Sequence, residues 1–425
     1  MGENKIEILE PQFSDNNLIN EIIIPKAIKK YFKSTTFKIK YDKPIITNES
    51  ILNIPALATI LPVSWLTGTN IHVKTLDKTF LESMTEVQAA YGEMYPKGNF
   101  SAKIFVDDVI ENTFKDTGYG LTFSGGLDST YSLMINSKKN PHLITYLGTD
   151  MSLAYPEEIA IIKKRYSNLA EKMHLEISFI ETNALSNLDT RRITHNFHHI
   201  LGGTLWEYLM HGLFNASYSA PISTGRFNKL LMASSDPSPD FKRKYGSSST
   251  IDGKIRWADK SVEQDGVIYR YKKAAGLKDC IEKYDLKLKV CTYKITENCS
   301  ACEKCYRTII SFLIAGIDPN LCGFKVNKQT FYEMKHLLQY KKLGGYLTQL
   351  HYIPYQEEMI KNEQKPIIEG YLEFCEWYKK LDLDKIIDKG TFWRNLYYLL
   401  PFTIADALFN FAKEKNFGMV QKVLK

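Results

Sequence analysis

The first 115 residues alternate between short strand-like runs and longer helical patterns of hydrophobic positions. Apolar and polar residues alternate with the period of a half-buried strand in Thr36–Tyr41, Ile71–Lys74 and Ala102–Val109. Leu76–Tyr95 has helical spacing, and the apolar stretch Ile51–Leu66 is interrupted by polar residues and is interpreted as a buried helix. The pattern therefore predicts an N-terminal α/β accessory domain over residues 1–115.

From Tyr119 onward, the pattern changes to buried strands that alternate with helices. This alternation is typical of a doubly wound parallel sheet, whose ligands bind beyond the carboxyl ends of the strands. The predicted elements are strands at Gly120–Phe123, His142–Leu147 and Leu175–Glu181, helices from Thr130 and Pro156, a helix near Asn196–Phe214 and a strand near Ala220–Ser223.

Two later regions differ from this repeated pattern. Residues 234–262 are rich in Ser, Asp, Gly and Pro and are interpreted as a loop or flap over the site. In this flap we expect Arg256 to pair with a substrate carboxylate and Trp257 to stack on a planar ring. Beyond residue 330 the periodicity is mostly helical. The chain is thus predicted to comprise an accessory domain (1–115), a central domain (116–330) and a helical C-terminal domain (331–425).

The composition is that of a globular protein, with 44% hydrophobic and 24% charged residues among 425. No uninterrupted apolar run is long enough to cross a bilayer, and the N-terminus lacks a secretory pattern, so we expect a cytoplasmic protein without a membrane partner. The net charge of +7 is compatible with nucleic-acid binding. Basic runs such as Phe241–Lys244 are interpreted as solvated surface, and a homo-oligomer is compatible with the sequence.

The heptapeptide SGGLDST, Ser124–Thr130, joins a predicted buried strand to a predicted helix. Gly125 and Gly126 allow the backbone to turn tightly and approach a phosphate, and the new helix offers unpaired N–H groups to an anion. The loop has no lysine where a kinase-type phosphate loop requires one. Asp128 is unusual beside phosphates, and it is expected either to support Mg²⁺ or to shape the loop.

The heptapeptide resembles the SGG-x-D-S signature of the pyrophosphatase-loop enzymes, the N-type ATP pyrophosphatases. The resemblance implies an adenine nucleotide α-hydrolase-like fold, with ATP and Mg²⁺ as cofactors and cleavage of ATP between the α and β phosphates. It implies that AMP is placed on a substrate oxygen, with Ser124, Asp128 and Ser129 as catalytic residues. The implied nucleotide-binding residues are Phe123, Ser124, Gly125, Gly126, Leu127, Asp128, Ser129 and Thr130, with Gly148 and Asn183 after the next two strands.

Four of the seven cysteines fall within fifteen positions, with the spacing Cys291-x7-Cys299-x2-Cys302-x2-Cys305. Four thiolates can surround one Zn²⁺ tetrahedrally, and such a closed shell is structural rather than catalytic. The sequence therefore predicts a structural zinc site. An iron–sulfur cluster is the alternative, and it would make the chain similar to sulfur-transferring tRNA enzymes.

The order of these motifs, a pyrophosphatase loop followed by the cysteine cluster, resembles the 7-cyano-7-deazaguanine synthase family over residues 118–315. That resemblance implies an ATP-dependent C–N ligase acting on 7-carboxy-7-deazaguanine. The stretch CEKCYRT, Cys302–Thr308, is also similar to enlarged relatives, some of which occur in anti-phage operons. About 115 residues precede the loop and about 95 follow the central region. These extensions suggest a nitrogen nucleophile larger than ammonia, such as an amine of a protein acceptor.

Basic residues after the predicted flap are further candidates. Arg270 and Lys273 fall where relatives carry a basic pair, and both are candidates to bind phosphate or the substrate carboxylate, with a surface salt bridge as the alternative interpretation of each. Arg307 follows the last cysteine, and the metal site could hold it toward the nucleotide. Two other functions fit the sequence: a thiolating or lysidine-type tRNA-modifying enzyme, and a nucleotide-binding regulatory protein without turnover.

Overall fold

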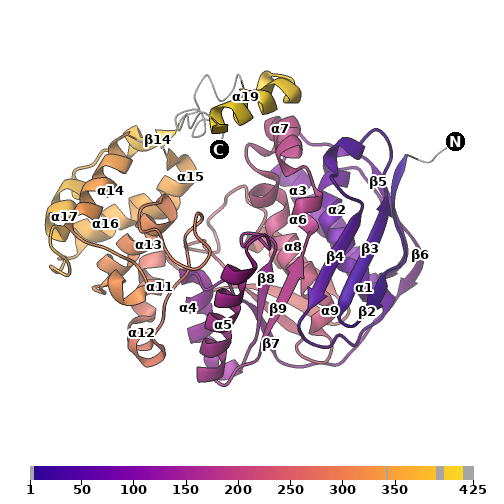
Figure 1. Cartoon of the computed structure of the whole chain (residues 1–425), viewed down its shortest axis with the longest axis horizontal. Coiled ribbons are helices and arrows are strands. Elements are labelled where there is room, and N and C mark those ends of the chain that lie inside the picture. The colour runs from indigo at the N-terminus through magenta and orange to yellow at the C-terminus, as the bar shows by residue number, and fades with distance from the viewer. Residues whose placement is uncertain (1–3, 341–342, 389–396, 415–425) are drawn as a thin grey trace.

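The computed structural model describes residues 4–340, 343–388 and 397–414 (Figure 1). The protein is an α/β protein built on one large mixed sheet of twelve strands. The strands are β1 (Lys5–Ile8), β2 (Gln12–Ser14), β3 (Asn17–Ile23), β4 (Thr36–Tyr41), β5 (Asn70–Asp77), β6 (Ile104–Ile110), β7 (Tyr119–Thr122), β8 (His142–Leu147), β9 (Ile177–Thr182), β10 (Lys229–Ala233), β11 (Arg256–Trp257) and β12 (Lys260–Asp265). A separate parallel pair joins β13 (Leu343–Gly344) to β14 (Ile387–Asp388).

The sheet has the strand order β11-β12-β10-β7-β8-β9-β4-β3-β1-β5-β6, with β2 paired to β3. The central strands β12, β10, β7, β8 and β9 are mutually parallel. All six residues of β8 are buried, as expected for a parallel strand covered on both faces. The antiparallel pair β4–β9, with Ile39 opposite Thr182, joins the N-terminal strands to this central group.

Helices cover the sheet and form the C-terminal region. Before residue 260 they are η1 (Lys29–Tyr31), α1 (Glu49–Leu52), α2 (Ile54–Thr67), α3 (Lys78–Met94), α4 (Leu127–Ile135), η2 (Ser137–Lys139), α5 (Pro156–Lys172), α6 (Ala184–Asn187), α7 (Thr190–Leu201), the π-helical turn η3 (Trp206–Met210), α8 (His211–Tyr218), α9 (Ala220–Ser223) and α10 (Ser249–Asp252). After it they are α11 (Arg270–Gly276), α12 (Lys278–Tyr284), α13 (Glu303–Ile314), η4 (Pro319–Cys322), α14 (Lys328–Tyr340), α15 (Gly345–Leu347), the π-helical turn η5 (Thr348–Tyr352), α16 (Ile353–Lys361), α17 (Tyr371–Lys379), η6 (Leu383–Ile386) and α19 (Phe402–Glu414).

The apolar stretch predicted to be a buried helix forms α1 and α2. Glu49–Thr67 is long and apolar enough to cross a membrane, but 94% of its most apolar window is buried inside the protein. Trp65 is fully buried, and α2 packs against α8 as well as β5. This stretch is therefore a core helix of the N-terminal region.

The hydrophobic core is divided into three clusters. The first joins the N-terminal strands and helices to η3, α8, α9 and β10, so its packing extends across residue 115. The second joins α11 and α13 to the C-terminal helices α14, α16 and α17, and the third fills the space between β7–β9 and α5. Figure 1 shows α14, α16 and α17 on the side of the molecule opposite β5 and β6. The domain boundaries at 115 and 330 stay predictions.

Three sequence expectations are corrected by the structure. Ala220–Ser223, expected as a strand, is the short helix α9, and the next strand is β10 at Lys229–Ala233. The expected helix near Asn196–Phe214 is broken at Gly202, which ends α7 in a left-handed conformation with φ of 76°. Trp257, expected to stack on substrate, is fully buried in the core, where its Nε1 donates to Ser223 Oγ at 3.0 Å.

Candidate functional site

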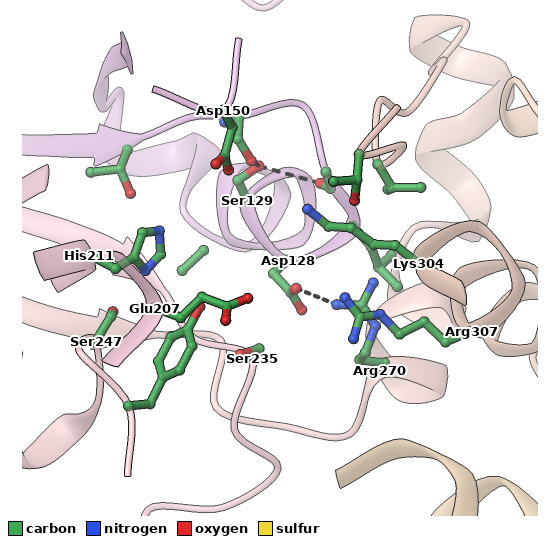
Figure 2. A pocket seen from close by; sticks show the side chains of 18 of the residues that line it. Asp128, Ser129, Asp150, Glu207, His211, Ser235, Ser247, Arg270, Lys304 and Arg307 are labelled. Carbon is green, nitrogen blue, oxygen red and sulfur yellow. Dashed lines mark hydrogen bonds and ion pairs between the residues drawn. The ribbon is translucent and has the colours of Figure 1, made fainter. Parts of the chain in front are cut away.

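A cavity of about 560 Å³ lies at the carboxyl ends of the parallel strands β7, β8, β10 and β12. Its walls come from the loop at Ser124–Ser129, the residues after β8, the turn η3 and the segment 235–247. The first turns of α13 and the segment from Tyr346 to His351 complete it. The predicted phosphate loop, the predicted flap, the cysteine cluster and the C-terminal region therefore meet at one site, part of which is drawn in Figure 2.

The predicted phosphate loop is a tight turn between β7 and α4. Gly125 has φ of +69°, and a Cβ there would lie 2.4 Å from Tyr166 Oη, so this position requires glycine. Tyr166 Oη donates to the carbonyl oxygen of Ser124 at 2.7 Å, and Lys289 N donates to that of Gly125 at 2.8 Å. These contacts from α5 and from the segment before the cysteine cluster fix the turn from both sides.

Within the loop, the two serines contact each other. Ser124 N donates to Ser129 Oγ at 3.2 Å, and the two hydroxyl oxygens lie 3.2 Å apart. α4 begins at Leu127, so the N–H groups of its first turn have no partner within the helix. The loop therefore presents hydroxyl groups and backbone N–H donors to the cavity, which is the chemistry of an anion site.

Asp128, in the first turn of α4, is held by two cations from α11. Arg270 forms an ion pair with Asp128, and Lys273 Nζ lies 2.7 Å from Asp128 Oδ1. Burial by itself would raise the pKa of Asp128, but Arg270 and Lys273 outweigh burial and hold that pKa well below its usual range. Both carboxylate oxygens are thus engaged by cations. This arrangement fits the expectation that Asp128 shapes the loop better than the expectation that it binds Mg²⁺.

The pair Arg270 and Lys273 is buried rather than solvated. The Lys273 side chain is fully buried, and its Nζ also contacts the carbonyl oxygen of Ser234. Burial lowers the pKa of Lys273, and Asp128 opposes that effect. Lys273 does not line the cavity, and its contact with the predicted phosphate loop is the ion pair with Asp128.

Cys291 and Cys302 line the cavity, and the Sγ atoms of the four clustered cysteines all lie within 4.8 Å of one another. Cys299 Sγ and Cys305 Sγ are 3.9 Å apart. In a tetrahedral zinc site with Zn–S near 2.3 Å, thiolate sulfurs are separated by about 3.8 Å. The predicted grouping of Cys291, Cys299, Cys302 and Cys305 is therefore confirmed, and the cluster can hold a metal such as zinc.

Asn298 supports this cluster and was not singled out by the sequence. Its Oδ1 accepts hydrogen bonds from Val290 N at 2.9 Å and Cys291 N at 3.1 Å. Its Nδ2 donates to the carbonyl oxygens of Leu288 and Gly323, at 2.9 and 3.1 Å. A buried amide that satisfies four backbone groups fixes the loop that carries Cys291.

α13 carries cluster cysteines and cavity residues together. Cys302 is its N-cap residue and Cys305 lies in its first turn, while Glu303, Lys304 and Arg307 line the cavity. Arg307 Nη1 lies 3.6 Å from Glu303 Oε2. The cluster thus fixes the start of the helix that brings Arg307 to the same cavity as the predicted phosphate loop.

The remaining predicted site residues are divided between the cavity and other places. Phe123 and Leu127 line the cavity, whereas Thr130 and Gly125 line a smaller hollow on the α5 side of the loop. Gly148 does not line the cavity. It has φ of +96°, and a Cβ there would lie 1.9 Å from the carbonyl oxygen of Thr182, so glycine is required for close strand packing.

Asn183 also lies outside the cavity lining. Its Oδ1 accepts from Lys38 N at 2.8 Å and its Nδ2 donates to the carbonyl oxygen of Thr36 at 3.1 Å. These bonds tie the end of β9 to β4. The predicted contact of Asn183 with the nucleotide stays a prediction.

Several cavity residues were not predicted from the sequence. Glu207 and His211 line the cavity from η3 and α8, and π-helical turns such as η3 often occur at functional sites. His351 lines it from the turn η5. Arg243 belongs to a basic run interpreted as solvated surface, but its side chain is 8% exposed and lies 2.7 Å from Asp236. Most side chains in a run of charged residues are exposed, but single members can be buried. The sequence does not show which member pairs with Asp236.

Comparison with protein-family models, curated proteins and solved structures found no match to this chain. What the site can do therefore rests on its geometry. Hydroxyl and N–H donors of the loop, several cations and a group of aromatic side chains surround one cavity large enough for a nucleotide.

Proposed function

We propose that this protein is an AMP-forming, ATP-dependent enzyme that adenylates a substrate carboxylate and then joins it to a nitrogen nucleophile. The observation that carries the proposal is the position of the SGGLDST loop, Ser124–Thr130. It follows β7, opens α4 and borders a cavity at the carboxyl ends of the parallel strands. Ligands of doubly wound α/β proteins bind at such an edge. The resemblance of the loop to the pyrophosphatase-loop signature is the reason for proposing ATP as the ligand.

The loop favours attack at the α-phosphorus rather than transfer of the γ-phosphoryl group. It contains no lysine, and its donors are the hydroxyls of Ser124 and Ser129 with the N–H groups of α4. In the proposed first step, a carboxylate oxygen attacks the α-phosphorus and pyrophosphate leaves. In the second step, the nitrogen nucleophile attacks the acyl carbon, loses a proton, and AMP leaves. Both carboxylate oxygens of Asp128 are already engaged by Arg270 and Lys273. We therefore expect Mg²⁺ to be bound by the phosphates of ATP rather than by Asp128.

For the substrate, we propose a planar heterocyclic acid such as 7-carboxy-7-deazaguanine. Trp257 is too deeply buried to stack on it, but other aromatic side chains line the cavity. They include Tyr146, Trp206, Tyr245 and Tyr346. Arg256 does not line the cavity and forms an ion pair with Glu86. We therefore assign the pairing with the substrate carboxylate to Arg243, which lines the cavity from the segment predicted to form the flap. The acceptor is ammonia or a protein amine.

Two finer assignments belong to the same proposal. We propose that the metal of the cysteine cluster is Zn²⁺, because a closed shell of four thiolates is typical of structural zinc. We also propose that the strands β7–β10 with their helices form the nucleotide-binding unit of an N-type ATP pyrophosphatase, in an enlarged relative of the 7-cyano-7-deazaguanine synthases.

The substrate can be tested by measuring pyrophosphate release from Mg·ATP with and without 7-carboxy-7-deazaguanine. We expect release that depends on this acid, and calorimetry should show that the acid binds in the presence of a non-hydrolysable ATP analogue. Ser129→Ala, which removes a loop hydroxyl, should lower the release. Release that depends on another acid would contradict the deazaguanine assignment alone. Tight ATP binding without any release would indicate a nucleotide-binding regulatory protein instead.

A further inference from the structure

Charged side chains are unevenly distributed around the cavity. Arg270, Lys304 and Arg307 lie together on one side of Asp128, as Figure 2 shows, whereas Glu207 lies on the other side. Asp128 is already shared between Arg270 and the buried Lys273. No ion pair from Lys304 to another described residue is present. The α11–α13 side therefore carries more positive than negative charge, and an anion there would relieve the repulsion.

The C-terminal region fixes Arg307 on this side. Tyr352, in the turn η5, donates from Oη to Glu303 Oε1 at 3.2 Å, and Glu303 is the carboxylate that faces Arg307. Tyr355 Oη donates to the carbonyl oxygen of Arg307 at 3.1 Å. Tyr352 is itself held, because Tyr378 Oη donates to its carbonyl oxygen at 2.8 Å. The position of Arg307 is thus set by residues more than forty positions later in the chain.

The same region adds His351 to the cavity wall. His351 is 2% exposed, and its Nδ1 has no hydrogen-bond partner among the described residues. Burial lowers the pKa of His351 well below its usual value, and Arg307, Arg270 and Arg243 lower it further. A neutral, buried imidazole among these cations adds no charge of its own, and it leaves a polar group that an entering ligand can use.

We propose that η5 and α16 complete a binding subsite for inorganic pyrophosphate, in which Lys304 and Arg307 contact the anion, His351 closes the wall, and Tyr352 positions Arg307 through Glu303. This inference rests on the proposed function, in which pyrophosphate is the leaving group. It assigns to the C-terminal extension a part of the reaction centre. Guanidinium and ammonium groups are suited to pyrophosphate, because hydrogen bonds between ionised partners are about twice as strong as neutral ones.

The subsite is tested by titrating pyrophosphate, and separately AMP, into the full chain and its variants in a calorimeter. Lys304→Ala should weaken pyrophosphate binding by about tenfold or more, since it removes a charge-assisted contact. Tyr352→Phe removes only the hydroxyl that positions Arg307 and should weaken pyrophosphate binding by about three- to tenfold. AMP binding should change by less than about twofold in both variants, because AMP lacks the departing phosphates.

Lys328→Ala is the matched control, since Lys328 is an exposed lysine that pairs with Glu369 outside the cavity. It should bind pyrophosphate as the unaltered protein does. Zinc content and thermal unfolding of each variant should be recorded, because Lys304 neighbours Cys305. A merely structural role for Tyr352 would change AMP and pyrophosphate binding together, and that result would overturn the proposal. Equal pyrophosphate affinity in Lys304→Ala and Lys328→Ala would overturn it as well.

Failure of the subsite can be separated from failure of the proposed function. If the protein releases AMP from ATP but the Lys304 and Tyr352 variants bind pyrophosphate normally, the subsite is wrong and the adenylation proposal stands. If pyrophosphate binds through Lys304 but ATP is not cleaved, the subsite stands and the adenylation proposal is wrong.

Discussion

Lys273 Nζ lies 2.7 Å from Asp128 Oδ1, although 145 positions separate the two residues in the chain. Lys273 is fully buried on α11, and Asp128 lies in the first turn of α4 beside the two glycines of the loop. The pair connects the helix after the flap to the predicted phosphate loop. Removing either charge deprives the other of an ionic partner.

Asp128→Asn is expected to destabilise the protein by roughly 3–5 kcal/mol, because it leaves the buried Lys273 without its counter-charge. A second change, Lys273→Met, should recover part of that loss, since the unpaired charge is then absent. Urea unfolding of the two single variants and the double variant gives the coupling free energy. Losses that simply add in the double variant would show that the two side chains do not interact.

The pair also predicts sensitivity to acid. The pKa of Asp128 is held below its usual value of 3.8, so the stability it supplies is fully present above that pH. That stability is lost as the pH falls below 3.8 toward the lower pKa of the folded state. The difference in unfolding free energy between the unaltered protein and Asp128→Asn should therefore shrink as the pH falls below about 4. A constant difference from pH 6 to 3 would contradict a depressed pKa.

For the cysteine cluster, we predict one Zn²⁺ per chain in a colourless protein. Cys302→Ser should lose the metal and much of the soluble protein, because a structural site contributes its binding energy to folding. Cys280→Ser is the control, since Cys280 lies outside the cluster. Metal analysis by mass spectrometry checks the prediction. Iron with a visible charge-transfer band would reverse the assignment.

Asn298→Ala should weaken the cluster without removing a thiolate. The change leaves two buried N–H groups and two buried carbonyl groups without their partner, at a cost of roughly 2–4 kcal/mol. Zinc affinity should fall by about tenfold or more, as for other residues that orient metal ligands. Competition with a chelator measures this. Asn362→Ala, an exposed change, should have no effect, and equal affinity in both variants would contradict the assigned role.

Asp252 should make the protein less stable as the pH rises. Burial raises the pKa of this carboxyl from 3.8 to about 7, and its Oδ2 accepts from Ser247 Oγ and Gln264 Nε2, two residues that line the cavity. The folded state holds the proton more tightly than the unfolded state. The stability due to Asp252 is therefore present below pH 4 and is lost as the pH rises through 7.

Asp252→Asn removes this dependence. As the pH rises from 4 to 8, the free energy of unfolding of Asp252→Asn should increase by on the order of 2–4 kcal/mol relative to that of the unaltered protein, since one pKa unit corresponds to about 1.4 kcal/mol. Urea unfolding at several pH values measures the difference. Parallel stability profiles of the two proteins would show that Asp252 titrates normally.

Much of the local structure could be predicted from periodicity. β4 and β8 have the predicted bounds, because alternation in one and a continuous buried run in the other are strong signals. Ala220–Ser223 was predicted wrongly, because a short, mostly apolar segment is equally compatible with a strand and a buried helix. Pro221, in the first turn of α9, is typical of a helix start and was the available signal.

The long-range part of the site could not be read from the sequence. Local periodicity does not show that β4 pairs with β9 or that Tyr352 Oη contacts Glu303. Each of these contacts joins elements through tertiary packing alone. The loop and the cysteines were predictable because their chemistry lies in consecutive or closely spaced residues.

The central claim is that the loop at Ser124–Thr130 directs cleavage of ATP between the α and β phosphates. The most direct measurement is ³¹P NMR of the products formed from Mg·ATP by the full chain with 7-carboxy-7-deazaguanine and ammonium. Ser129→Ala provides the control for contaminating activities. The account predicts AMP and pyrophosphate in equal amounts, with much less of both from Ser129→Ala. ADP and phosphate, formed by the unaltered protein and lost in Ser129→Ala, would contradict it.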